Sequence, residues 1–209
     1  MAFGEGSVSG FIFVGNYLCL DFANTRLVED GRSVDLLGTY SDLVRWLLEA
    51  GVLGPEEAEE AKERWGDGPE GERVFGRALA FREVLFGLIE DILGGEPVRQ
   101  ETLDEINALL RSRPGYAQVA CTDEGLEEQF VAERDEEINA IVPLAESAAD
   151  LLLRGVPSLL KKCENPACVL HFYDTSKNHA RRWCSMSGCG NRMKAAAHYR
   201  RQRRPEAQS

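Results

Sequence analysis

Apolar residues recur every three or four positions along most of the chain before residue 155, the spacing of helices with one buried face. Ser41 is the expected N-cap of the first such helix, and Pro55 opens the second. Pro143 lies inside the last one, so we expect a kink there or a later start. The predicted helices cover residues 41–50, 55–66, 70–93, 99–111 and 134–154.

Two other stretches depart from this spacing. Residues 11–25 are apolar with a Gly-Asn break, which suggests a short strand and then one helical face. Residues 26–38 are polar and are expected to form a loop, whereas residues 116–132 straddle Thr-Asp-Glu-Gly and predict a small β-hairpin. The predicted fold is mainly α: a multi-helix N-terminal domain with one hairpin over 1–155, then a separate module over 156–209.

Charge is divided along the same boundary. The chain has 209 residues and a net charge of −11, which by itself argues against a nucleic-acid partner. However, residues 1–160 hold 13 basic and 32 acidic side chains, whereas residues 161–209 hold 11 basic and 3 acidic ones. The second segment therefore carries +8 and becomes a candidate for binding a polyanion.

Four cysteines gather in the basic segment, with the spacing Cys163-x4-Cys168 and Cys184-x4-Cys189. Two close pairs joined by a short loop are typical of a tetrahedral four-thiolate zinc site. Two disulfides are the alternative. The absence of a secretory signal or a long apolar run predicts a cytoplasmic protein, where cysteines stay reduced and no membrane is bound. Cys19 and Cys121 lie in apolar surroundings and are expected to be buried.

A basic helix is predicted after the last cysteine, over about 189–204. If it meets double-stranded DNA, its cations contact phosphates, and Asn191 or an arginine near its start reads bases. Two alternatives stay open: a merely solvated tail, and docking of the helix on the acidic domain. The candidate DNA-binding residues are Arg181, Arg182, Asn191, Arg192, Lys194, Arg200, Arg201, Arg203 and Arg204.

These motifs resemble a known family. Arg-Trp-Cys-Ser-Met over 182–186, Cys-Gly-Asn-Arg over 189–192 and Phe-Tyr-Asp-Thr-Ser over 172–176 resemble the CGNR zinc-finger family. The segment 14–25, Val-Gly-Asn-Tyr-Leu-Cys-Leu-Asp-Phe-Ala-Asn-Thr, resembles the ABATE domain that usually precedes this finger. The resemblance implies a bacterial, stress-linked transcription regulator with a zinc-dependent DNA-binding end. It also implies that the four clustered cysteines are the zinc ligands.

Several motif residues have structural interpretations. Phe172 and Trp183 are expected to form the core of the finger, and Asp174 is expected to cap a turn that bonds an arginine. Asp21, Asn24 and Thr25 are expected to bridge helices, or alternatively to line a pocket for a small-molecule effector.

The function predicted from the sequence is a zinc-dependent, DNA-binding transcription regulator whose N-terminal domain senses a signal or forms a homodimer. The alternative is a zinc-stapled protein-interaction module without direct DNA binding. An enzyme is not expected, because the chain shows no phosphate loop and no nucleophile elbow. Residues 1–170 also contain no histidine, the commonest general acid or base.

Overall fold

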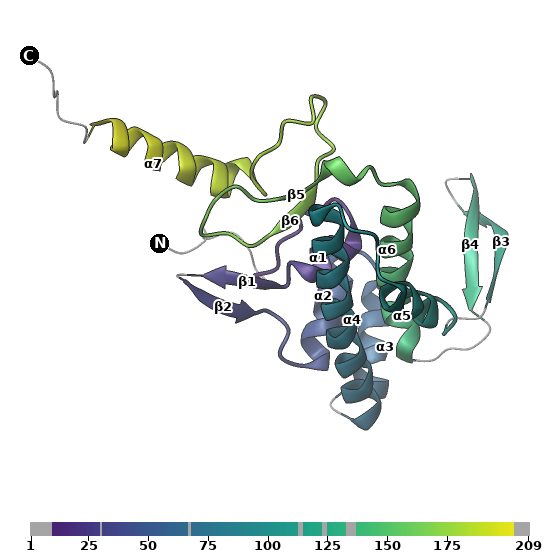
Figure 1. The fold of residues 1–209 in the computed structure, drawn as a ribbon. Coiled ribbons are helices and arrows are strands. Elements are labelled where there is room, and N and C mark those ends of the chain that lie inside the picture. The colour runs from purple at the N-terminus through teal and green to yellow at the C-terminus, as the bar shows by residue number, and fades with distance from the viewer. Residues whose placement is uncertain are drawn as a thin grey trace, which may run out of the picture.

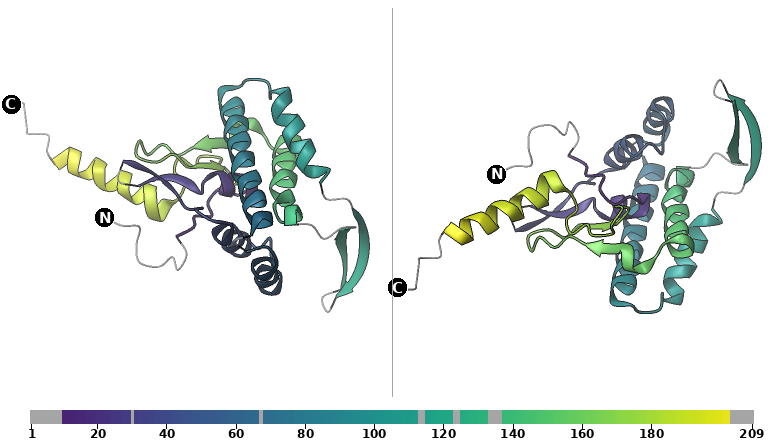
Figure 2. Two further views of the ribbon diagram at one scale, coloured as in Figure 1. Left: turned by 90° about the horizontal axis from the view of Figure 1, so that it is seen from below. Right: turned by 90° about the horizontal axis from the view of Figure 1, so that it is seen from above.

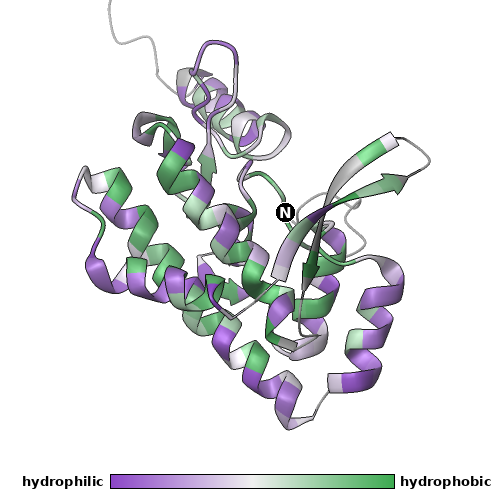
Figure 3. Ribbon diagram, turned by 90° about the vertical axis from the view of Figure 1, so that its right-hand side faces the viewer, coloured by the Kyte–Doolittle hydropathy of each residue, from purple (hydrophilic) through white to green (hydrophobic). Residues whose placement is uncertain are grey.

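The computed structural model describes residues 10–29, 31–66, 68–112, 115–122, 125–132 and 137–202. Its body is a bundle of helices packed around the long helix α4, with their apolar faces turned inward (Figures 1 and 3). Phe22, Trp46 and Phe81 are the largest side chains with no exposed surface. The helices of the bundle are α1 (Leu18–Ala23), α2 (Tyr40–Glu49), α3 (Pro55–Trp65), α4 (Pro69–Gly94), α5 (Gln100–Leu110) and α6 (Val142–Arg154).

The helix ends follow local chemistry. Thr39, not Ser41, is the N-cap of α2: its hydroxyl accepts from Asp42 N at 3.2 Å, and Asp42 in turn accepts from the Thr39 amide at 3.1 Å. The prediction of Ser41 was wrong by two positions, since only Thr39 has an extended backbone that can cap. Pro143 lies in the first turn of α6, which follows a 3₁₀ turn, η1 (Glu137–Ile141), so the later start is the outcome.

The hairpin predicted over 116–132 is present as β3 (Gly115–Thr122) and β4 (Gly125–Ala132), and it extends away from the bundle (Figures 1 and 2). Cys121 lies in β3 and is exposed, so the expectation that it is buried was wrong. Cys19 is buried as expected.

A second hairpin replaces the loop predicted over 26–38. It consists of β1 (Arg26–Glu29) and β2 (Arg32–Asp35). Residues 11–17, by contrast, form no strand. The hairpin is held by tertiary contacts: the buried guanidinium of Arg82 on α4 donates to Asp35 at 2.8 Å, and Leu27 is buried against the C-terminal module. The sequence signal for these strands is weak because such contacts come from distant segments.

The C-terminal module begins directly after α6 and packs on the side of α1 and β1 (Figure 1). Phe172 lies at its centre with no exposed surface, as predicted, and Trp183 is half-buried beside it. Its elements are η2 (Pro157–Leu159), β5 (Leu160–Lys162), β6 (His171–Tyr173), η3 (Met186–Gly190, one π-helical turn) and α7 (Asn191–Gln202). Among the described helices, none has the length and apolar character needed to cross a bilayer.

Candidate metal centre and basic helix

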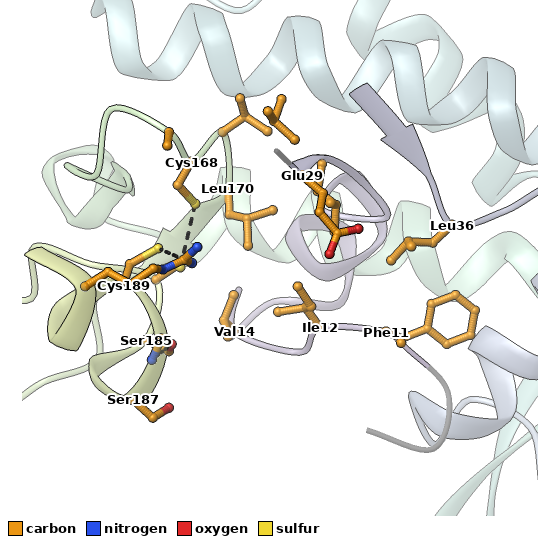
Figure 4. A pocket seen from close by; sticks show the side chains of 18 residues that line it. Phe11, Ile12, Val14, Glu29, Leu36, Cys168, Leu170, Ser185, Ser187 and Cys189 are labelled. Carbon is orange, nitrogen blue, oxygen red and sulfur yellow. Dashed lines mark hydrogen bonds between the residues drawn. The ribbon is translucent and has the colours of Figure 1, made fainter. Parts of the chain in front are cut away.

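Two loops bring the four clustered cysteines together. Cys163 and Cys168 flank the turn that follows β5, and Cys184 and Cys189 flank the turn that enters η3. Their four Sγ atoms all lie within 4.8 Å of one another. Cys163, Cys184 and Cys189 are buried, whereas Cys168 is half-buried and faces a neighbouring cavity (Figure 4). No other described group of three or more histidine, cysteine or acidic side chains is close enough to hold a metal ion.

Nitrogen donors surround the sulfurs. The buried Asn165 side chain donates to Cys189 Sγ at 3.2 Å, and the Cys184 amide donates to Cys163 Sγ at 3.4 Å. The Arg192 guanidinium also donates to Cys189 Sγ, at 3.3 Å. Donors of this kind stabilise thiolates and fix their direction, as the outer shell of a metal site does. Asn165 was not singled out in the sequence, although its place between two cysteines is a signal for this role.

The four thiols fit a zinc ion. The hydrogen bond that Cys184 shares with Cys168 lowers the pKa of Cys168 to about 5 and, followed by burial, raises the pKa of Cys184. Burial likewise raises the pKa of Cys163. Four sulfurs this close cannot all ionise without a cation between them, and four thiolates in a tetrahedral arrangement suit Zn²⁺. When bound, the ion would supply folding free energy to a module with a small apolar core.

Asp174 organises the loop between the two cysteine pairs. Its carboxylate is fully buried and accepts hydrogen bonds from Lys161 Nζ at 2.6 Å, Ser176 Oγ at 2.6 Å and the Arg181 amide at 2.9 Å. Burial alone would raise the pKa of Asp174, but the donors outweigh it and hold that pKa well below its usual range. The predicted capped turn is therefore present. Lys161, which the sequence analysis did not identify, supplies the counter-charge.

Arg181 points inward. Its guanidinium lies 4.1 Å from the centre of the Phe172 ring and donates to the carbonyl oxygens of Val14 at 2.9 Å, Trp183 at 3.1 Å and Cys184. These contacts tie the N-terminal segment to the second cysteine loop. Arg182 is exposed, but it donates to the Glu164 carboxylate at 2.7 Å and lies over the Trp183 ring. Both arginines thus have partners inside the module.

Of the three residues predicted as bridges or effector ligands, Asn24 and Thr25 are buried and Asp21 is half-buried. Asp21 accepts from the amides of Val14 and Gly15, each at 2.7 Å. Asn24 is 2% exposed; its side chain donates to His171 O at 2.8 Å and accepts from His171 N at 2.9 Å. Thr25, also buried, accepts from Arg82 at 2.8 Å. None of the three lines either of the two cavities described in this structure.

The remaining basic candidates belong to α7, which projects away from the body (Figures 1 and 2). Among the described residues, the helix packs mainly on the preceding turn η3. Asn191 lies at its start, where its amide donates to Ser187 O at 3.3 Å, and Lys194 and Arg200 are exposed. Arg201 lies in the last turn of α7, whereas Arg203 and Arg204 lie outside the described residues.

One side of α7 joins Asn191, a predicted base reader, to polar and aromatic residues that the sequence analysis did not identify. Positions 191, 195, 198, 199 and 202 follow the i, i+4, i+7, i+8, i+11 spacing of one helical face. They hold Asn191, Ala195, His198, Tyr199 and Gln202, and all five are exposed. The half-buried residues of the helix, Met193 and Ala197, lie on the other side. This spacing is visible in the sequence once the helix is placed.

Comparison with protein families gives two matches that together span most of the chain. The ABATE model, described as "Putative stress-induced transcription regulator", matches residues 16–155, and the CGNR zinc-finger model matches residues 160–202. Neither is a family of enzymes. A comparison with curated proteins finds no match. The cluster of four thiols and the finger match together identify zinc as the cofactor.

Proposed function

The chain belongs to the ABATE family and ends in a CGNR zinc finger, and from this premise we propose that it is a zinc-dependent transcription regulator that binds duplex DNA through α7. In this proposal Cys163, Cys168, Cys184 and Cys189 are the zinc ligands. The N-terminal domain senses a signal or forms a homodimer, and the chain has no catalytic activity of its own.

A single observation carries the proposal: a basic helix extends into solvent from a metal-organised base (Figure 1). With 12 residues, α7 is about 18 Å long, and an α-helix fits the width of the major groove. Cys189 lies in the π-helical turn η3, which leads directly into the start of α7. The direction of the helix therefore depends on the geometry at the sulfurs.

The surface of α7 supports separate roles for base contacts and phosphate contacts. The exposed face that begins at Asn191 and ends at Gln202 offers amide, imidazole and phenol groups, and Asn and Gln side chains pair with adenine in the major groove. By their positions in the helix, Arg192 lies on one flank of this face and Lys194 and Arg201 lie on the other, whereas Arg200 lies opposite it, on the side of Met193 and Ala197. Cations on both flanks suit the two phosphate backbones beside a groove.

The inward contacts of Arg181 remove it from the proposed DNA-facing set, and the pairing of Arg182 with Glu164 makes its contribution smaller. Docking of α7 on the acidic domain receives no support from its direction, since it leaves the body rather than running along the bundle (Figure 2). The contacts of Asn24 and Arg181 instead join the N-terminal domain to the base of α7, which suits the transfer of a signal.

The test is the salt dependence of duplex binding by the full, zinc-loaded chain, measured by fluorescence anisotropy. For a double variant, Lys194→Ala with Arg201→Ala, we expect the slope of log affinity against log salt to fall by about 2, because each lost phosphate contact removes about 0.9. The control, Arg32→Ala with Arg45→Ala, changes the net charge equally at two exposed positions of the N-terminal domain.

The control variant should keep the wild-type slope. Equal slopes for the wild type and the α7 variant would contradict the assignment of α7. A complete lack of duplex binding would favour the protein-interaction module instead. Selection of bound sequences from random DNA would then test the reading face: His198→Ala and Gln202→Ala should change the preferred sequence while leaving the salt slope unchanged.

A further inference from the structure

A cavity of about 570 Å³ lies where the N-terminal domain meets the zinc finger (Figure 4). The segment 10–14, the strand β1 and both cysteine loops of the finger form most of it, and Leu36 and Arg192 complete the lining. Cavities that bind small molecules usually measure about 300–1,000 Å³ and are lined mainly by apolar side chains. This cavity falls within that range.

Most of its lining is apolar. Ile12 and Val14 come from the N-terminal segment, Leu27 and Val28 from β1, and Leu170 from the finger. Several of these side chains point into the space in Figure 4. When an apolar molecule displaces water from such a surface, the free energy of the system falls, because apolar side chains leave contact with water. The cavity therefore favours an apolar occupant.

Two charged side chains line the cavity, and they have opposite signs. Glu29 lies toward one side, across the space from Cys189, and Arg192 donates to the sulfur of that cysteine. In the zinc-loaded chain the four thiolates also leave two negative charges beside the cavity, because the ion balances only two of them. An anion would be repelled by Glu29 and by the thiolates, and its charge would lose water without a free partner, since Arg192 already donates to Cys189. The arrangement thus disfavours an anionic ligand relative to an uncharged one.

We propose that this cavity is a binding site for a small, uncharged, mainly apolar molecule, and that its occupation stabilises the zinc centre. The link to zinc is direct, because Cys168, Cys184 and Cys189 all line the cavity. Cys168 is the least buried of the four, so an occupant would shield it from water and from competing chelators. The site rests on the cavity itself; only an effect of its ligand on DNA binding would rest on the proposed function.

The experiment uses the full, zinc-loaded chain and two fluorescent probes that share one ring system. N-phenyl-1-naphthylamine is uncharged, and 8-anilinonaphthalene-1-sulfonate differs from it by one sulfonate. We expect the uncharged probe to bind more tightly. Val14→Phe, which fills the cavity, should weaken its binding by about tenfold or more. Val98→Phe is the matched control, because Val98 is also half-buried but does not line the cavity.

Val28→Phe serves as a second cavity-filling variant if Val14→Phe does not fold. A second readout is the rate at which a chromophoric chelator removes zinc. The uncharged probe should slow that rate in the wild type and in Val98→Phe, but not in the cavity-filling variants.

The proposal fails if the uncharged probe does not bind, or if it binds the cavity-filling variants as well as the wild type. It also fails if the sulfonate binds more tightly in a way that Val14→Phe abolishes. Residues 1–9 directly precede the lining residue Gly10 in the sequence. If the uncharged probe binds only after residues 1–9 are deleted, these residues are the natural occupant of the cavity, and the proposal is overturned. DNA binding plays no part in these measurements, so their failure leaves the proposed function standing.

Discussion

Replacement of Asn24 by Ala should loosen the joint between the zinc finger and the helical bundle. Asn24 follows α1, is 2% exposed, and bonds both backbone groups of His171 on β6. The Asn24 side chain thereby provides hydrogen-bond partners for the N–H and C=O of His171 at the edge of β6. Truncation to alanine leaves a partly buried N–H and C=O of His171 without this partner, and each costs about 1–3 kcal/mol. We therefore expect the free energy of unfolding to fall by about 2–6 kcal/mol, a large part of the usual 5–15 kcal/mol.

The assay is urea unfolding of the zinc-loaded chain, followed by the fluorescence of the buried Trp46 and the half-buried Trp183. Asn24→Asp should not rescue the loss, because a carboxylate cannot donate to His171 O and would be buried with a charge. Asn107→Ala, at an exposed position on α5, is the control and should change little. A loss below about 0.5 kcal/mol for Asn24→Ala, the size of ordinary surface effects, would refute this role of the amide.

Three further predictions concern the same joint. Arg181→Lys should lower the free energy of unfolding by about 1–3 kcal/mol, because a compact ammonium lacks the planar, forked guanidinium that reaches three separate carbonyl oxygens here. The variant should leave the salt slope of DNA binding unchanged, and a reduced slope would mean that Arg181 contacts DNA. Burial, aided by the positive charge of Lys162, lowers the pKa of His171 to about 4. The unfolded chain, with a His171 pKa of about 6.5, therefore binds a proton more readily than the folded chain does. The contribution of the neutral ring to stability is complete above about pH 6.5 and is lost as the pH falls toward 4. An NMR titration should find the imidazole neutral at about pH 5.5, and a midpoint above about 6 would contradict its burial. Gly15→Ala should lower the free energy of unfolding in urea by about 1–3 kcal/mol, because a Cβ at this position would lie 2.8 Å from Leu20 Cβ. An unchanged midpoint of urea unfolding would mean that the backbone around Gly15 shifts without cost.

The helices and the cysteine cluster could be predicted because their signals are local. The apolar spacing of α4 and the glycine that ends it lie within one stretch of sequence. The spacing of the four cysteines alone predicts a metal site, and the structure brings their sulfurs together. Even the start of α6, with Pro143 in its first turn, follows from the fixed backbone of that residue.

The joint could not be predicted in the same way, because its contacts connect residues far apart in the sequence. Asn24 bonds a residue 147 positions away, and Arg181 bonds one 167 positions away. A basic residue beside a zinc-binding motif looks the same in sequence whether it faces DNA or the interior. The hairpin β1–β2 was missed for a related reason, since it depends on the buried Arg82 from α4.

The exposed polar face of α7, from Asn191 to Gln202, could be predicted from the sequence, because its residues share one helical spacing. The many basic residues in the same segment hide this spacing. Placing the half-buried Met193 and Ala197 fixed which side of the helix faces the module. The opposite side then stood out by its exposed His198 and Tyr199, whose rings lie 6.1 Å apart.

The central claim is that a zinc-organised base holds α7 in the orientation that binds duplex DNA. The most direct measurement is the duplex affinity of the full chain when it is zinc-loaded, after chelation of the metal, and after zinc is restored, at one fixed salt concentration. The account predicts binding that is lost with the metal and returns with it. Affinity that is unchanged by chelation would contradict the claim, because the positive charge of α7 would then suffice without the zinc centre.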